Sequence, residues 1–191
     1  MPVFSFVAVT ATLGESLYLL HRKLIKNGVS NLPMLSAQDR NRLIAAIQSL
    51  PDEVEALVAS LDDAQLTSHP IEGEWSIAQN VHHLVDSHIN SYVRCKLMAT
   101  EERPSFRPYD EAAWAELPDA SSPDISISLA LLRALHRRWV VFWRSLTEEQ
   151  WQRRGYHPGS DRTVSLADQL QIYVEHGRAH MRQIRRNLSE F

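Results

Sequence analysis

The 191-residue chain has few cysteines for cross-links and no excess of basic residues for binding a negatively charged partner. It contains one cysteine, Cys95, which excludes an internal disulfide and fits a reducing compartment. No histidine lies at helical reach of Cys95, so we expect a small buried residue rather than a nucleophile. Its 20 Lys and Arg residues are outnumbered by 23 Asp and Glu residues, which excludes the strongly basic surface typical of nucleic-acid binding.

Long hydrophobic runs are also missing. The most apolar stretch, residues 1–14, is too short to cross a bilayer as a helix, and no basic residue precedes it as in a signal peptide. We expect residues 1–35 to form an N-terminal extension that packs on the domain or on a partner chain, with a secretion signal as the alternative. No membrane partner is expected.

No segment alternates between apolar and polar residues for long enough to predict a strand, whereas helical spacing recurs throughout. Three helix starts follow Ser36, Ser76 and Ser165, each with Asp or Gln three residues later as in a capping box. The four predicted helices cover residues 37–61, 77–98, 125–146 and 166–188. Pro51 should kink the first helix or divide it. The sequence therefore predicts an all-α chain with one domain over residues 36–191.

The connections between these helices differ in length. Residues 62–75 are rich in turn formers and should join antiparallel neighbours. Residues 100–124 contain four prolines, and we expect this segment to be an ordered crossover, with Trp114 and Leu117 as apolar anchors and Tyr109 as a polar-tipped one. Before the fourth helix, the sequence predicts a short helix at 147–151 and then turns.

The last helix carries the strongest chemical signal. His176 and His180 are four residues apart, so both imidazoles lie on one helical face, close enough for one zinc ion to bridge them. The pair His82 and His83 on the second helix could supply a third ligand. With nine histidines in the chain, chance alone could also produce this spacing. Gly177 stands where zinc proteases of the His-Glu-x-x-His type have their general base, which excludes that mechanism.

The second helix has a polar stripe beside its apolar face. This stripe consists of Asn80, His83, Ser87 and either Asn90 or Ser91, and it either faces solvent or lines a wet cavity between helices. His83 is then the better third ligand, because His82 points about 100° away. Asp86 could orient an imidazole or pair with a nearby basic residue, and His88 is expected to be hydrogen-bonded and partly buried.

Several segments together resemble one known family. They are 75–76 (WS), 81–88 (VHHLVDSH), 92–96 (YVRCK), 107–111 (RPYDE), 114–117 (WAEL), 128–132 (SLALL), 156–158 (YHP) and 173–180 (YVEHGRAH). This combination resembles the DinB-like superfamily, and within it the YfiT group of metal-dependent hydrolases. The resemblance covers residues 36–188, nearly everything except the N-terminal extension.

The resemblance implies a four-helix bundle of DinB-like type with up-down-down-up topology and a long crossover between its second and third helices. It further implies one divalent metal ion per chain, held by His83, His176 and His180 and completed by water. Zinc is the default for three imidazoles, with nickel as an alternative. A cytoplasmic homodimer is implied as well, and related proteins transfer small thiols such as bacillithiol or mycothiol.

Two classes of function remain open at this point. As an enzyme, the protein would act on a small-molecule substrate, either by metal-dependent hydrolysis or by transfer of a low-molecular-weight thiol. Asp86, Arg94 and Arg178 are the candidate catalytic residues, and no general base stands out. The lack of a general base slightly favours thiol transfer. As a non-enzyme, it would be a structural or sensory helical bundle in which the metal joins two helices.

Overall fold

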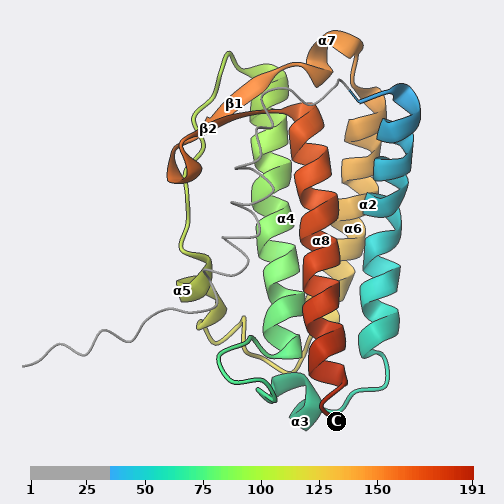
Figure 1. Cartoon of the computed structure of the whole chain (residues 1–191), viewed down its shortest axis with the longest axis vertical. Coiled ribbons are helices and arrows are strands. Elements are labelled where there is room, and N and C mark those ends of the chain that lie inside the picture. Colours follow the sequence, from blue (N-terminus) through green and yellow to red (C-terminus); the bar gives the residue numbers. More distant parts are fainter. Residues whose placement is uncertain (1–34) are drawn as a thin grey trace, which may run out of the picture.

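The computed structural model describes residues 35–191, so the expectations for residues 1–34 lie outside the described residues. The long helices α2 (Ala37–Val58), α4 (Ile77–Thr100), α6 (Ser126–Ser145) and α8 (Leu166–Leu188) form a bundle (Figure 1). In Figure 1, α2 and α8 run in one direction along the bundle, and α4 and α6 run in the other. Two parallel neighbours, α4 and α6, therefore need a connection that returns along the whole bundle.

The three predicted helix starts are confirmed. The hydroxyls of Ser36, Ser76 and Ser165 accept the backbone N–H groups of Asp39, Gln79 and Asp168. These bonds satisfy N–H groups that would otherwise lack a partner at a helix start. Pro51 lies inside α2 and does not divide it, and this helix ends at Val58 rather than at residue 61.

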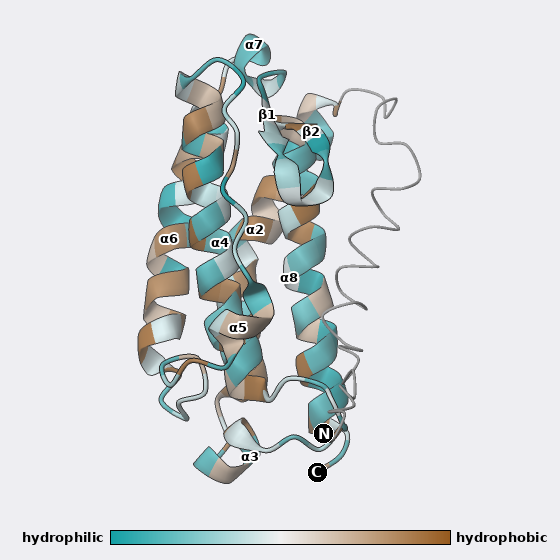
Figure 2. Cartoon of the chain, turned by 90° about the vertical axis from the view of Figure 1, so that its left-hand side faces the viewer, coloured by the Kyte–Doolittle hydropathy of each residue, from teal (hydrophilic) through white to brown (hydrophobic). Residues whose placement is uncertain are grey.

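Apolar residues recur along all four long helices (Figure 2) and fill the bundle in two clusters. One cluster, nearer the hairpin end, contains Trp139, Trp143 and Leu170, and the other contains Leu84, Leu132 and Ile184. All six of these side chains are at most 1% exposed. Burial of such large apolar surfaces supplies the main driving force for folding, so the bundle does not depend on its polar interior.

The expectation of an all-α chain is wrong between α6 and α8. After the short helix α7 (Glu148–Trp151), which the sequence predicted, strands β1 (Arg154–His157) and β2 (Arg162–Ser165) form an antiparallel hairpin around the 3-10 turn η2 (Pro158–Ser160). Each strand has four residues, too few to show alternation in the sequence. Two more short helices, α3 (Asp63–Thr67) and α5 (Glu111–Ala115), lie in the other connections.

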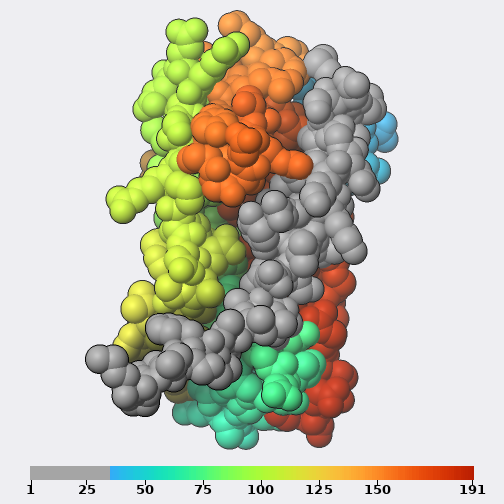
Figure 3. Space-filling view, turned by 60° about the vertical axis from the view of Figure 1, so that its left-hand side comes forward, coloured from blue at the N-terminus to red at the C-terminus, as the bar shows by residue number. Residues whose placement is uncertain are grey.

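The connection between α4 and α6 is ordered and runs along the bundle to α5 (Figure 1). Near its start it joins the hairpin, since the N–H of Phe106 donates to the carbonyl of Tyr156 over 2.9 Å. Gly155 makes room for Phe106, because a Cβ there would lie 2.2 Å from the ring carbon Cζ. Figure 3 shows the orange hairpin against the yellow-green start of this crossover.

The apolar anchors expected for this crossover are wrong. Trp114 and Leu117 are 38% and 49% exposed, whereas Phe106 and Ala115 are each 3% exposed. Trp114 instead packs beside Tyr109, with ring centroids 4.5 Å apart. Small and aromatic side chains that fit against the helices thus hold the crossover, rather than its largest apolar residues. Within residues 35–191, no helix is long and apolar enough to cross a membrane.

Candidate metal centre

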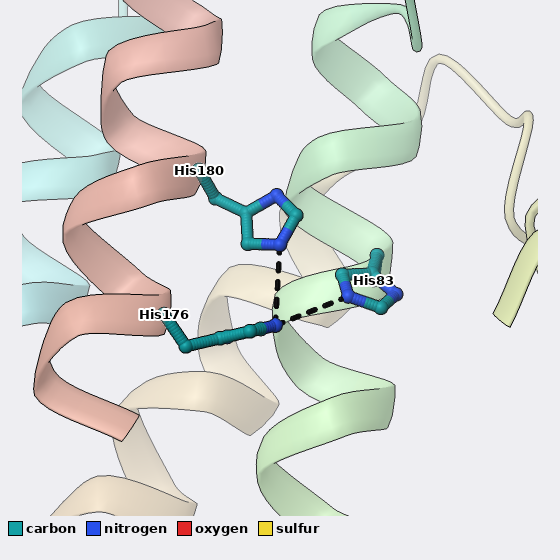
Figure 4. A group of neighbouring side chains, drawn as sticks. All are labelled: His83, His176 and His180. Atoms are coloured by element: carbon teal, nitrogen blue, oxygen red, sulfur yellow. Dashed lines mark hydrogen bonds between the residues drawn. The ribbon is translucent and has the colours of Figure 1, made fainter. Parts of the chain in front are cut away.

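His83, His176 and His180 converge between α4 and α8 (Figure 4). The Nε2 atom of His176 lies 3.3 Å from Nε2 of His83 and 3.2 Å from Nε2 of His180. Two zinc–nitrogen bonds of about 2.0–2.1 Å at a tetrahedral angle separate their nitrogens by about 3.3–3.4 Å. Two of the three nitrogen pairs therefore have the separation of a tetrahedral metal site, and all three ligand atoms lie within 4.8 Å of one another.

Helix packing positions these three side chains. His176 and His180 lie one turn apart on α8, and their ring centroids are 4.5 Å apart. Gly177 lets α8 approach α2, because a Cβ at this position would lie 2.5 Å from Cδ2 of Leu50. Gly177 therefore serves close packing of α8 on α2.

Two of the three histidines in the cluster are buried, and His176 is half-buried. His83 and His180 are 4% and 0% exposed, and the Trp75 ring lies against both, with centroids 4.7 and 6.1 Å away. Burial lowers the pKa of His83 to about 3 and the pKa of His180 well below its usual value. Both imidazoles are therefore neutral at physiological pH, each with a nitrogen lone pair available to a metal ion.

Asn80 orients His180. The Nδ1–H of His180 donates to Oδ1 of Asn80 over 2.8 Å, and the amide nitrogen of Asn80 donates to the carbonyl of Ser76 over 2.9 Å. This bond leaves Nε2 of His180 unprotonated and facing the cluster. The polar stripe on α4 is thus buried, since Asn80, Ser87 and Ser91 are at most 1% exposed. The sequence identified the stripe but not the role of Asn80.

A second line of hydrogen bonds leads away from His176. Its Nδ1 lies 3.3 Å from Nε2 of His88, and Nδ1 of His88 lies 2.8 Å from Nε2 of His136. Nδ1 of His136 lies 2.5 Å from the carbonyl oxygen of Ile47. We call His176, His88 and His136 the histidine relay. His88 is fully buried rather than partly buried as expected, and no sequence pattern had indicated His136.

The other two candidates on α4, His82 and Asp86, are not part of the cluster. His82 turns away, as expected from its helical position, and its ring nitrogens lie 2.8 and 2.9 Å from the Ser128 hydroxyl and the Ser122 carbonyl. Among the described residues, the hydrogen-bond partners of His82, His83 and His180 do not include the Asp86 carboxylate. Partial burial and the nearby Asp119 raise the pKa of Asp86.

The two arginine candidates differ sharply. Arg178 lies on the exposed side of α8 and forms a 3.4 Å pair with Glu175. Arg94 is 9% exposed, donates to the carbonyl of Arg107 over 3.1 Å and lies over the Phe106 ring. No carboxylate of the described residues lies within ion-pair distance of Arg94. The Arg94 charge nevertheless acts on the nearby Glu111, because burial raises the pKa of that carboxyl and the charge opposes the rise.

A helical bundle in which three imidazoles converge has the architecture of a metal-binding protein. Comparison with known proteins agrees with this class. Residues 46–184 match the model of the DinB superfamily, and the chain belongs to that family.

The relatives are bacterial proteins of similar length. The chain is 42% identical over 150 residues to "Putative metal-dependent hydrolase YfiT" of Bacillus subtilis, covering 78% of this chain and 84% of the relative. It is 45% identical over 141 residues to a protein of the same description from Bacillus pumilus, covering 74% and 80%. Both of these similar proteins are thus named as putative metal-dependent hydrolases.

Two solved structures share the fold. YfiT from Bacillus subtilis, described as having an unusual four-helix bundle topology, matches with a TM-score of 0.77 and 40% identity, covering 83% of this chain and 93% of that one. A mycothiol-dependent maleylpyruvate isomerase matches with a TM-score of 0.50 and 20% identity, covering 78% and 59%. The second likeness concerns the fold alone.

Proposed function

We propose that the protein is an enzyme that binds one divalent metal ion, zinc by default, through His83, His176 and His180. The observation that carries this proposal is the convergence of three imidazoles whose ligand atoms all lie within 4.8 Å of one another, with His83 and His180 neutral. No fourth histidine, cysteine or carboxylate of the described residues joins this group, which leaves a position for water or substrate. The names of the relatives support metal-dependent hydrolysis as the reaction.

A bound metal ion would supply Lewis acidity, which lowers the pKa of water or stabilises a thiolate at neutral pH. The chain contributes the three ligands, the orientation of His180 through Asn80, and an apolar wall formed by the Trp75 ring. Arg94 could hold an anionic part of the small-molecule substrate, and the nearby Tyr109 hydroxyl has no hydrogen-bond partner among the described residues. These two groups would then fix the substrate on the crossover side of the bundle.

Thiol S-transfer is the second candidate reaction. It is favoured by the surroundings of His83 and His180, because neither imidazole is hydrogen-bonded to a carboxylate of residues 35–191 that could act as a general base. A thiolate, unlike water, needs no base once it has lost its proton to solvent. The likeness of fold to a mycothiol-dependent isomerase is compatible with this chemistry but does not extend to its residues.

The deciding experiment compares metal-loaded and metal-stripped protein on activated esters, amides and electrophiles, with and without bacillithiol, mycothiol, glutathione or cysteine. Turnover without thiol supports hydrolysis, and thiol-dependent turnover supports S-transfer. The His176→Ala, His180→Ala double variant should lose both metal and turnover, whereas the exposed His69→Ala control should keep them. Full retention of metal by the double variant would refute the site.

The alternative class is a structural or sensory bundle in which the metal joins α4 and α8. It predicts unfolding on chelation and no turnover on any substrate, because a structural metal contributes directly to the free energy of folding. We also propose a cytoplasmic homodimer. The exposed apolar residues Ile127, Leu131 and Val141 on one side of α6 offer a contact surface for a second copy.

A further inference from the structure

Pro51 leaves one carbonyl group of α2 without its helical donor. In an α-helix the carbonyl of residue 47 accepts the N–H of residue 51, but proline has no N–H, and its ring pushes that carbonyl away from the helix axis. Pro51 lies inside α2 and is buried, so solvent cannot satisfy the Ile47 carbonyl. A buried carbonyl without a donor is strongly destabilising, so another group must reach it.

His136 of α6 is that group. Its Nδ1 lies 2.5 Å from the Ile47 carbonyl oxygen, and the side chain is 1% exposed. A carbonyl oxygen accepts hydrogen bonds and cannot donate them, so the proton of the neutral ring must be on Nδ1. Nε2 of His136 is then an acceptor. The neighbouring nitrogen, Nδ1 of His88, lies 2.8 Å away and must donate to it.

The position of the ring proton can be assigned in the same way for His88 and His176. With its proton on Nδ1, His88 presents the lone pair of Nε2 to Nδ1 of His176, 3.3 Å away. His176 must then also carry its proton on Nδ1, so that its Nε2 presents a lone pair to the cluster. All three rings thus have one donor and one acceptor in a fixed order, with no choice of tautomer left open.

We propose that Pro51 and the histidine relay fix His176 in its metal-binding tautomer before any metal arrives. This inference rests on the metal site of the proposed function. The relay orients and does not conduct protons, because it ends on a carbonyl that cannot take up a proton. Trp139 and Tyr173 present their rings nearly perpendicular to His88, at centroid distances of 5.7 and 5.1 Å, and hold it in place. Pro51, His136 and His88 are therefore positioning residues.

The first test needs no metal. Long-range proton–nitrogen correlation spectra of metal-free protein labelled with ¹⁵N-histidine show which ring nitrogen carries the proton. We expect His88, His136 and His176 to carry it on Nδ1. A proton on Nε2 of His176 in the wild-type protein would overturn the proposal. Because this readout is independent of binding, a wild-type protein that takes up no metal would count against the proposed function alone.

The second test measures zinc affinity by competition with a chromophoric chelator. His136→Leu removes the acceptor for His88 and should weaken zinc binding about 10–100-fold, the usual effect of losing an outer partner of a metal ligand. His136→Gln keeps an oxygen close to the position of Nε2 and should retain most of the affinity. Leu132→Ala, one turn away in the same core, is the matched control for lost stability and should bind zinc as the wild type does. Equal affinities for all four proteins would refute the relay.

The third test uses Pro51→Ala, which gives α2 back its missing N–H. Replacement of an interior proline by alanine should keep or raise the free energy of unfolding. The restored N–H competes with His136 for the Ile47 carbonyl, so we expect zinc affinity to fall about tenfold while stability does not fall. A residue with a structural role alone would change both quantities in the same direction. Unchanged zinc affinity in a stably folded Pro51→Ala protein would contradict the proposed function of Pro51.

Discussion

Metal-free protein should lose much of its stability when the pH falls from 7 to 5. Burial lowers the pKa of His83 to about 3 and the pKa of His136 to about 4, whereas an exposed histidine in the unfolded chain titrates near 6.5. The unfolded state therefore binds protons over a range in which the folded state does not. Stability is complete above the unfolded pKa of about 6.5 and decreases as the pH falls towards the folded values.

The magnitude follows from these shifts. At pH 5 the pH is about 1.5 units below the pKa of a histidine in the unfolded chain. Protonation there stabilises the unfolded state by about 1.36 kcal/mol per unit, or about 2 kcal/mol for each of the two histidines. Together they remove about 4 kcal/mol, against a typical total of about 5–15 kcal/mol for a domain. His88 and His180, whose pKa values burial also lowers, change stability in the same direction. We therefore expect marginal stability near pH 5.

The assay is urea unfolding at pH 5, 6, 7 and 8 in the presence of a chelator, followed by circular dichroism. The His83→Gln variant is the control, since removal of one buried imidazole should reduce the loss between pH 7 and 5 by about 2 kcal/mol. An unfolding free energy that changes by less than about 1 kcal/mol over this interval would refute the reasoning, because four buried neutral imidazoles could not then be present.

Four further outcomes are expected. Chelation at pH 7 should leave the far-ultraviolet circular dichroism unchanged, because neither apolar cluster contains a metal ligand; loss of helix would favour the structural alternative. Gly155→Ala should destabilise the protein by about 1–3 kcal/mol and speed proteolysis within residues 101–125, because its Cβ meets the Phe106 ring. Cys95, whose pKa burial raises, should react with a thiol reagent at pH 8 only after unfolding. Light scattering should give about twice the 21.8 kDa of one chain, and the monomer mass would refute the proposed dimer.

The long helices could be predicted from the sequence because their signals are local. Ser36, Ser76 and Ser165 each satisfy an N–H group three residues away, and apolar spacing then marks the buried face. The hairpin could not be predicted in this way. Its strands have four residues each, and they are held by pairing with each other and with the crossover, which no local pattern reveals.

The same difference applies to the metal centre. The spacing of His176 and His180 on one helix is visible in the sequence, and helical geometry separates His83 from His82. The contact between His88 and His136 joins residues 48 positions apart, so nothing in the sequence around either one indicates it. Trp114 and Leu117 failed as anchors for a related reason, because size and polarity do not tell which side of a loop faces the helices.

The adjacent histidines of α4 have consequences for mutational scanning. The His82 ring spans the Ser122 carbonyl and the Ser128 hydroxyl, and so fastens the end of the crossover and the start of α6 to α4. The next residue, His83, faces the cluster between α4 and α8. A growth-based scan would score neighbouring positions 82 and 83 as equally intolerant and suggest one shared role. Measured separately, metal content should fall with changes at 83, and resistance to proteolysis with changes at 82.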